Sequence, residues 1–399
     1  MKRYKLGVIG LGARAEAFAR NLYAGSQRAE LFGLCDLDED RMKKFCDYCG
    51  IKGTKLFLDP EEFMSQKEMD GVIITTPDFA HCEPALLAIA AKKHFYLEKP
   101  MDVTLERCHT IMKAVRGTGV RSYMGFNMRC TAGYQKLKEV VDSGVLGQIV
   151  QIEGLEQLHV AHSASFMRRY HRLRKQSGGL LNTKSSHDMD MMQWLIGHQH
   201  KLKRVAAFGG TNVFLPKKAP AKRCSECPPE IYRACRYKDA AGFVFSVHAK
   251  EPIHHRDTAT YGGDMCVYNS EKDIADNMTA IFEWDSGIRG NFNLQLFQYE
   301  GARITKIWGE NGLLEYRDGK ITLIQSPTGH RHEITPKGYA GGHGGSDPML
   351  IGNFIDAIEG KEENSNLSAG LTAAILALKA EEAMVVGKVL EIDPKLYQP

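Results

Sequence analysis

The pattern of hydrophobic and polar positions divides the chain into two parts. Over residues 1–126, short apolar runs alternate with segments whose apolar residues recur every 3.6 positions, as from Leu105 to Val115. The runs predict strands at 4–10, 29–35, 55–57, 71–75, 94–97 and 121–125. Because strands and helices alternate, this part is predicted to fold as a parallel, doubly wound sheet.

Beyond residue 147 the pattern changes to long segments in which apolar and polar residues alternate. These predict strands at 149–158, 242–250, 279–284, 289–298 and 306–309, several of them separated by turn signals such as Asp285-Ser-Gly. A helix is predicted at 187–196, and a helical region from 347 to 386 is expected to pack back on one of the domains. The chain is therefore expected to be an α/β protein of two domains, 1–126 and 127–399, the second with a mainly antiparallel sheet.

The composition narrows the classes of partner. With 399 residues, 43% of them hydrophobic and 25% charged, the chain resembles an ordinary globular protein. Its net charge of 52 − 48 = +4 gives no reason to expect nucleic acid or an anionic membrane as a partner. No apolar run approaches the roughly 18 residues of a membrane span, and the N-terminus leads directly into a predicted strand, without a signal peptide. The ten cysteines are then expected to be reduced thiols in a cytoplasmic protein.

A glycine turn follows the first predicted strand and opens a helix. Backbone N–H groups at such a helix N-terminus face a bound pyrophosphate. Gly10 permits the turn, Gly12 lets the phosphates approach the backbone, and Ala15 allows the helix to pack closely on the strand. Ala13 and Arg14, at the start of the helix, are expected beside the cofactor.

An acidic residue, Asp36, ends the next apolar stretch at 36 − 10 = 26 positions beyond the first glycine. A carboxylate there accepts hydrogen bonds from the adenosine ribose hydroxyls and repels a 2′-phosphate. No Arg occupies positions 37–39, so the sequence favours NAD over NADP. The alternative is that Asp36 only caps the helix predicted at 38–49.

Four short motifs carry a resemblance to a known family. Glu98-Lys99-Pro100, together with Gly10-Leu-Gly12, Thr75-Thr-Pro77 and His187-x-x-Asp190, resembles the glucose–fructose oxidoreductase, inositol dehydrogenase and MocA (Gfo/Idh/MocA) family over nearly the whole chain. The resemblance implies an N-terminal Rossmann domain at 1–126. It also implies a C-terminal α/β domain at 127–399 whose open sheet serves substrate binding and oligomerisation as a homodimer or homotetramer. The implied reaction is hydride transfer between NAD(P) and a carbohydrate or cyclitol hydroxyl.

The first of these motifs places Lys99 at the carboxyl end of a parallel strand, where open α/β sheets bind ligands. Its ammonium can hydrogen-bond the reacting hydroxyl and stabilise the alkoxide that develops during hydride loss. Glu98 is expected to face the nicotinamide ribose or to orient the lysine, whereas the alternative for Lys99 is a surface lysine after a strand. The cofactor is further expected along Thr75, Thr76, Pro77 and His81, the last as a contact or only as a helix cap.

His187 is the expected acid–base residue, because its unperturbed pKa near 6.5 suits proton transfer around neutrality. Asp190 shares its helix face and is expected to orient the imidazole or to bind substrate; the alternative is a buried histidine satisfied by Asp190. The family usually carries an Asp four residues before this histidine, and here that position is Thr183. Lys184 next to it either adds a second cation to the pocket, favouring an acidic substrate or lowering the pKa of a neighbouring lysine, or points to solvent.

Three further residues are expected on the substrate side. Arg129 belongs to the Phe126-Asn-Met-Arg129 segment, and Arg168 lies in a basic stretch that either grips a carboxylate or phosphate or forms a solvated loop. His343 lies in a glycine-rich segment that either closes over the sugar or only connects two elements.

The cysteines at 224–235 form a separate pattern. Cys224-x-x-Cys227, followed by Cys235, suits tetrahedral thiolate binding of zinc, with Cys266, His254 or His255 as the fourth ligand. Reduced thiols without a metal are the default expectation.

The sequence thus favours an NAD-dependent dehydrogenase that acts on a sugar, sugar-acid or cyclitol hydroxyl. Lys99 would stabilise the alkoxide and His187 would take the proton. Two alternatives remain open at this stage. One is a glycoside-cleaving enzyme that oxidises the sugar transiently, eliminates the aglycone and returns the hydride; the other is a nucleotide-sensing protein without activity.

Overall fold

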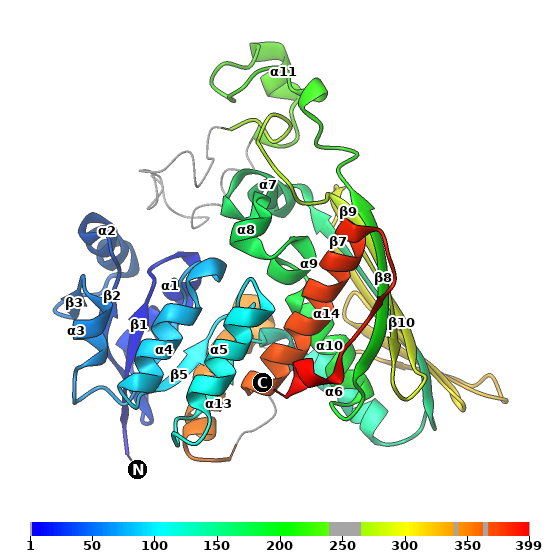
Figure 1. Cartoon of the computed structure of the whole chain (residues 1–399), viewed down its shortest axis with the longest axis horizontal. Coiled ribbons are helices and arrows are strands. Elements are labelled where there is room, and N and C mark those ends of the chain that lie inside the picture. Colours follow the sequence, from blue (N-terminus) through cyan, green and yellow to red (C-terminus); the bar gives the residue numbers. More distant parts are fainter. Residues whose placement is uncertain (1, 239–264, 339–341, 362–365, 399) are drawn as a thin grey trace.

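The computed structural model describes the chain except for residues 1, 239–264, 339–341, 362–365 and 399. Two sheets stand apart in it, with helices between them (Figure 1). The first sheet has the order β3-β2-β1-β4-β5-β6, and every neighbouring pair is parallel. Its strands are β1 (Tyr4–Ile9), β2 (Ala29–Cys35), β3 (Lys55–Phe57), β4 (Gly71–Ile74), β5 (His94–Leu97) and β6 (Ser122–Met124). The predicted doubly wound parallel sheet is confirmed.

The central strands of this sheet are continuous apolar runs in the sequence, as is typical of strands whose two faces are both covered by helices. Every residue of β4 is buried, as are Leu6 and Val8 of β1. Side chains fix where two of the helices begin: Asp38 accepts the N–H of Arg41, and Thr104 accepts the N–H of Arg107. The helices of this half are α1 (Ala13–Ala24), α2 (Glu39–Cys49), α3 (Pro60–Met64), η1 (Asp78–Ala80), α4 (Cys82–Ala90) and α5 (Leu105–Val115).

The second sheet has nine strands in the order β14-β13-β12-β11-β7-β10-β9-β8-β15. Among its described strands only β7 and β10 pair in parallel, so the expected mainly antiparallel sheet is confirmed. The strand predicted at 242–250 lies outside the described residues. The strands are β7 (Ile149–His159), β8 (Leu202–Gly210), β9 (Asn277–Trp284), β10 (Arg289–Gln298), β11 (Ala302–Gly309), β12 (Gly312–Arg317), β13 (Lys320–Gln325), β14 (Arg331–Ile334) and β15 (Leu390–Glu391).

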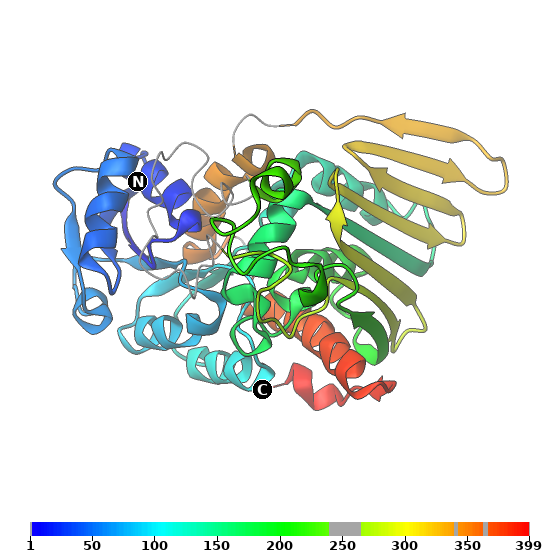
Figure 2. The same cartoon turned by 90° about the horizontal axis from the view of Figure 1, so that it is seen from above.

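Helices α10 (Ser186–Ile196) and α14 (Leu367–Val386) cover one face of this sheet (Figures 1 and 2). Trp284, at the end of β9, lies between the sheet and α10. It is fully buried and donates its indole N–H to Gln193 of α10 at 3.0 Å. On the other face, Phe208 is 74% exposed and Ile281 is 53% exposed. The sheet therefore has one face that is packed against helices and one face on which some apolar side chains are exposed to solvent.

The two C-terminal helices link the sheets. Helix α13 (Gly342–Ile358) packs against the first sheet, where Phe354 meets the ring of Tyr96 edge-on at 6.2 Å. Helix α14 contacts α5 of the first half as well as β8 of the second sheet. The predicted region 347–386 is thus two helices, one on each side of the junction between the sheets.

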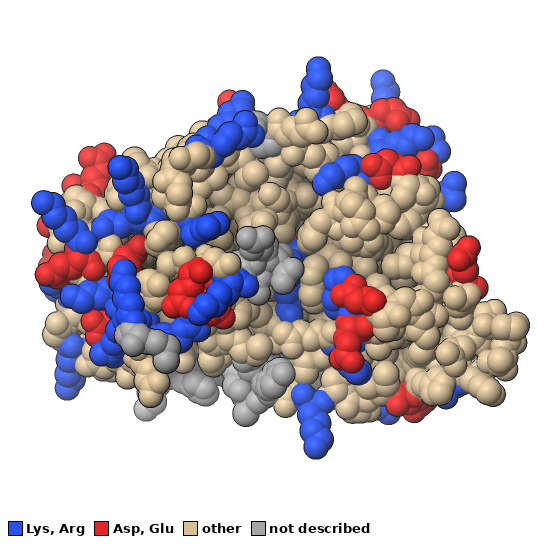
Figure 3. Space-filling view, turned by 90° about the horizontal axis from the view of Figure 1, so that it is seen from below, with Lys and Arg blue, Asp and Glu red and all other residues tan. Residues whose placement is uncertain are grey.

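Short helices between β6 and β8 form the rest of this junction. They are η2 (Asn127–Cys130), α6 (Ala132–Asp142), α7 (Val160–Arg168), η3 (Tyr170–Arg172), α8 (Arg174–Ser177) and α9 (Leu180–Thr183). In the described part of the chain, none of the helices has the length and apolar character needed to cross a membrane. On the face shown in Figure 3, side chains of both charges are interspersed, in keeping with the small net charge.

Candidate active site

The glycine turn between β1 and α1 fits a dinucleotide. Gly10 has a φ of +85°, and a Cβ there would lie 2.6 Å from backbone atoms of Thr76. A Cβ on Gly12 would meet nothing within 4 Å, so this side of the turn is open to a ligand. Ala15 is fully buried between helix and strand. The roles expected for these three residues agree with this geometry.

Asp36, at the end of β2, faces the same turn. Its Oδ2 accepts the N–H of Leu11 at 2.8 Å and its Oδ1 accepts the N–H of Asp38 at 3.1 Å. Asp38, rather than Asp36, is the residue that caps α2. The fold also brings the guanidinium of Arg41 to 3.4 Å from Oδ1, which the absence of Arg at 37–39 did not indicate.

Several residues expected to contact the cofactor are hydrogen-bonded to their neighbours in the protein. Glu98 Oε1 accepts hydrogen bonds from Arg14 Nε at 2.6 Å and from the Tyr96 hydroxyl at 3.0 Å. Its Oε2 accepts the backbone N–H of Lys99 at 3.2 Å, so Glu98 orients the lysine through the main chain. Arg14 also reaches Asp347 of α13 at 2.7 Å. These bonds fix the segment that carries Lys99.

A second set of hydrogen bonds joins the segment after β4 to the glycine turn and to the loop after β5. The Thr75 hydroxyl donates to the carbonyl of Gly10 at 2.8 Å. The buried imidazole of His81 lies between two carbonyl oxygens, those of Pro100 at 2.7 Å and of Thr76 at 3.0 Å. His81 therefore connects the loop after β4 to the loop after β5 through its two ring nitrogens. It acts in this way as a positioning residue for Lys99.

The Lys99 ammonium points across the junction and donates to the carbonyl of Thr183 at 2.9 Å. The Thr183 hydroxyl in turn donates to Asp78 at 2.5 Å, and the Tyr170 hydroxyl donates to the other oxygen of Asp78 at 2.9 Å. Thr183, at the position where the resemblance implies an Asp, thus binds a carboxylate from the first domain. Asp78 was not predicted, although it follows Pro77 at the carboxyl edge of the sheet, where ligands bind.

Lys184 does not point to solvent. It is buried and its ammonium lies 2.8 Å from Glu156 Oε1. Glu156 also pairs with Arg303 at 2.5 Å, and Arg303 Nε reaches Asp188 at 2.7 Å. Glu156 and Arg303 stand directly opposite each other on β7 and β11. The sequence did not indicate these three partners, because the register of strands so far apart in the chain cannot be read from it.

This crowding of charges shifts several pKa values. Burial lowers the pKa of Lys99, and the nearby Lys184 lowers it further, while Asp78 opposes both effects. Burial and the neighbouring Glu156 raise the pKa of Asp188 to about 7, although Arg303 opposes them. Burial and Lys184 lower the pKa of His162 to about 3. The surroundings of Lys99 therefore disfavour additional positive charge.

His187 opens α10 four residues after Thr183, and its partly buried ring meets Phe126 at 6.3 Å. Asp190 does not serve the imidazole in the way expected. Both of its oxygens are bound by Arg129, at 2.6 and 2.8 Å, and the guanidinium also lies over Trp194. Arg129 and Asp190 thus form a buried ion pair that joins η2 to α10, and the substrate role expected for Arg129 and the catalytic role expected for Asp190 stay predictions.

Of the two other residues expected on the substrate side, the structure describes the side chain of Arg168 only. Arg168 is buried in contact with the carbonyl of Met265 and the sulfur of Cys224, because it ends α7 and turns toward the connection between β8 and β9. It is thus neither a solvated loop residue nor part of the Lys99 pocket. The side chain of His343 lies outside the described residues.

Comparison with known proteins agrees with this architecture. A family model described as "Oxidoreductase family, NAD-binding Rossmann fold" matches residues 4–126, and one described as "Oxidoreductase family, C-terminal alpha/beta domain" matches residues 138–388. The putative oxidoreductase YteT of Bacillus subtilis is 26% identical, with 90% of this chain and 89% of YteT covered. The myo-inositol 2-dehydrogenase of Thermotoga maritima is 27% identical, with 80% of this chain and 93% of that protein covered.

Among solved structures, the WlbA dehydrogenase of Bordetella pertussis, in complex with NADH and UDP-GlcNAcA, has a TM-score of 0.71 and 18% identity. The alignment covers 98% of this chain and 99% of that one, which shows a shared fold. Together, the two matched domains and the nucleotide turn, Glu98-Lys99-Pro100 and His187 in their expected order show that the chain belongs to the Gfo/Idh/MocA oxidoreductase family.

Proposed function

We propose that the chain is a dehydrogenase that uses NAD to oxidise a hydroxyl group of a sugar, sugar acid or cyclitol, or to reduce the corresponding ketone. Family membership makes it an NAD-binding oxidoreductase. The observation that carries the proposal is the position of Lys99. Its ammonium lies at the carboxyl edge of the first sheet, is partly buried, and bridges to Thr183 in the second domain.

The residues of the chain have distinct tasks in this reaction. NAD, held by Gly10, Gly12 and Asp36, would supply the hydride acceptor. Lys99 donates a hydrogen bond to the reacting oxygen and stabilises the negative charge that develops there. His187 takes the hydroxyl proton. Glu98 holds the backbone of Lys99, so that the ammonium is positioned before substrate arrives.

The charged groups near Lys99 suit a ligand with many hydroxyl groups. Lys184 and Glu156 lie close enough to Lys99 to influence its pKa, and Glu156 pairs with both Lys184 and Arg303. This mixture supports a polyol, a sugar or a sugar acid as the small-molecule substrate. Because Lys184 is paired with Glu156, it does not by itself demand an acidic substrate.

The assembly and location follow as parts of the same proposal. The uncovered face of the second sheet, with Phe208 and Ile281 in the open, supports a homodimer or homotetramer. All ten cysteines are thiols in the structure, which supports a reducing, cytoplasmic location.

The direct test is a substrate panel. Purified protein is mixed with NAD and free sugars, sugar acids, cyclitols and aryl glycosides while NADH absorbance is followed. Growth of NADH with one class supports the proposal and identifies the substrate class. Release of aglycone from the aryl glycosides without NADH contradicts it and favours glycoside cleavage.

Asp36→Ser is expected to shift the cofactor preference from NAD toward NADP by about 10- to 100-fold in kcat/KM, since a hydrogen bond to a charged group contributes roughly 1.5–3 kcal/mol. The substitution removes the charge that repels a 2′-phosphate and leaves Arg41 beside the pocket to bind it. Steady-state kinetics with both cofactors measure the ratio. If Arg41 is responsible, Arg41→Met in the Asp36→Ser background cancels the gain with NADP; an undiminished gain rejects this role.

Lys184→Met is expected to move the pH limb of kcat/KM that reports Lys99 to higher pH. Lys184 lowers the pKa of Lys99 by charge repulsion, and its loss also leaves Glu156 less neutralised, which raises the pKa of Lys99. The pH profile of kcat/KM measures the shift, and Lys203→Met on the exposed surface of β8 is the matched control. A shift to lower pH would show that Lys184 does not act on Lys99 in this way.

A further inference from the structure

The described parts of the connection between β8 and β9, residues 211–238 and 265–276, include residues that the site described so far does not use. Its described helices are η4 (Pro216–Lys218) and α11 (Pro229–Ala234), and neither contains a buried residue. A connection of this length is uncommon unless it has a function. Its described residues include buried apolar side chains, those of Phe214, Tyr237, Val267 and Ile274. The two helices lie outside this core, where a staple such as a disulfide or a metal would hold them.

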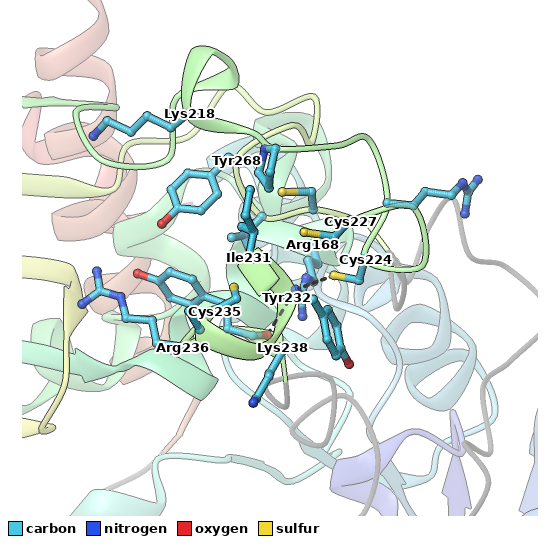
Figure 4. Close-up of a pocket in the computed structure, with 16 residues that line it drawn as sticks. Arg168, Lys218, Cys224, Cys227, Ile231, Tyr232, Cys235, Arg236, Lys238 and Tyr268 are labelled. Atoms are coloured by element: carbon cyan, nitrogen blue, oxygen red, sulfur yellow. Dashed lines mark hydrogen bonds between the residues drawn. The ribbon is translucent and has the colours of Figure 1, made fainter. Parts of the chain in front are cut away.

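Four cysteines of this connection line one cavity of about 420 Å³: Cys224, Cys227, Cys235 and Cys266. Figure 4 shows the first three around α11. The backbone brings the fourth to them, because Arg223 and Met265 form an antiparallel bridge and Cys266 donates its N–H to the carbonyl of Lys222 at 3.1 Å. All four are thiols in the structure.

The Cys-x-x-Cys pair forms a tight turn. The N–H of Cys227 donates to the carbonyl of Cys224 at 3.2 Å, which keeps the two side chains on one local loop. A pair of cysteines at this spacing, joined by two more from distant segments, is the donor set of a closed structural zinc site. Cys235 follows α11 and Cys266 lies across the bridge, so both described parts of the connection contribute.

The surroundings of the sulfurs are positively charged. Arg168 is 1% exposed and donates to Cys224 Sγ at 3.5 Å and to the carbonyl of Met265 at 2.7 Å. Within the described residues it pairs with no carboxylate, and its Nη1 has no hydrogen-bond partner. A buried guanidinium without a carboxylate calls for another anion. The Cys224 thiol, which already contacts Arg168, becomes such an anion when it is ionised.

The other charged residues that line the cavity have the same sign. They are Lys218, Arg223, Arg236 and Lys238, and the described lining contains no Asp or Glu. Cations of this kind stabilise thiolates. They also offset the net charge of −2 that four thiolates give a divalent ion, and N–H groups that contact the sulfurs are the usual outer partners of such ligands.

We propose that Cys224, Cys227, Cys235 and Cys266 bind one zinc ion as four thiolates and so fasten the connection between β8 and β9 to the body of the domain. Among the described residues, no three His, Cys, Asp or Glu side chains lie close enough together to hold a metal ion. The proposal therefore requires the four thiols to move toward the zinc ion as it binds. Each thiol that binds releases its proton to solvent, and four sulfur–zinc bonds form.

Metal analysis of the purified full-length protein tests the proposal. The expected content is about one zinc per chain, and Cys227→Ser and Cys235→Ser are each expected to reduce it to background. Cys46→Ser is the matched control, because Cys46-x-x-Cys49 on α2 has the same spacing and no part in the cavity. Cobalt substitution of the wild-type protein should give the strong thiolate-to-metal absorption of a tetrahedral site.

Three outcomes overturn the proposal. Iron with acid-labile sulfide in place of zinc would show an iron–sulfur cluster. A metal-free wild-type protein that takes up no zinc or cobalt after reduction, while a thiol reagent titrates all four cysteines, would show plain thiols. Loss of zinc in Cys46→Ser but not in Cys227→Ser would place the metal elsewhere. Measurement on the wild-type protein keeps the test decisive even if a variant fails to fold.

Discussion

Lys99→Ala is expected to lower kcat by about 10²- to 10³-fold while the Kd for NADH changes little, since removal of one oriented donor at a developing oxyanion costs that much. The ammonium is held by a hydrogen bond to the carbonyl of Thr183 and by the carboxylate of Asp78 nearby, and the bond from Lys99 N–H to Glu98 fixes its backbone. The nucleotide turn contains none of these bonds to the ammonium, so cofactor binding is expected to survive.

The measurement pairs single-turnover kinetics with NADH fluorescence titration. Lys93→Ala is the matched control, because Lys93 immediately precedes β5 and its ammonium binds the carbonyls of Gln66 and Met69 at the opposite end of the strand. The control should keep its kcat. An unchanged kcat in Lys99→Ala would contradict the assignment of the site.

Arg129→Met is expected to lower the free energy of unfolding by about 3–5 kcal/mol, because removal of one partner leaves the other charge buried. The pair is inaccessible: the Arg129 side chain is 4% exposed and that of Asp190 is 1% exposed. Burial raises the pKa of Asp190 even with Arg129 in place, so the carboxylate depends on this partner to stay ionised.

Denaturant titration measures the loss, and two further variants interpret it. Lys136→Met breaks an exposed pair with Glu139, and it should cost less than about 1 kcal/mol. The double variant Arg129→Met/Asp190→Asn should recover much of the loss, because no charge is left buried. If Asp190→Asn instead lowered kcat without a loss of stability, Asp190 would act on the reaction and not on the fold.

The first sheet could be predicted almost residue by residue. Its central strands are buried on both faces, so their apolar runs stand out from the polar helices around them. β2, β5 and the edge strand β3 have the bounds that the pattern predicted. The second sheet was predicted only in its centre. Strands such as β14 are mostly exposed, and neighbouring strands stabilise them more than their own pattern does.

The candidate site also has a part that local sequence patterns locate and a part that they do not. The glycine turn, Asp36 and Lys99 follow strands directly, so a local pattern locates them. The pairs that complete the pocket join distant positions: Glu156 and Arg303 are 147 residues apart, and Asp78 and Thr183 are 105 apart. Such pairs depend on the register of the second sheet and on how the two domains meet, and no local pattern encodes either.

The most direct test of the central claim is the stoichiometry of the reaction. With the substrate found in the panel, NADH and the oxidised product are quantified together over one reaction course. The account predicts one NADH for each ketone formed, and loss of both in Lys99→Ala. Product that accumulates without NADH, by cleavage of a glycosidic bond with the cofactor returned to its starting state, would contradict it.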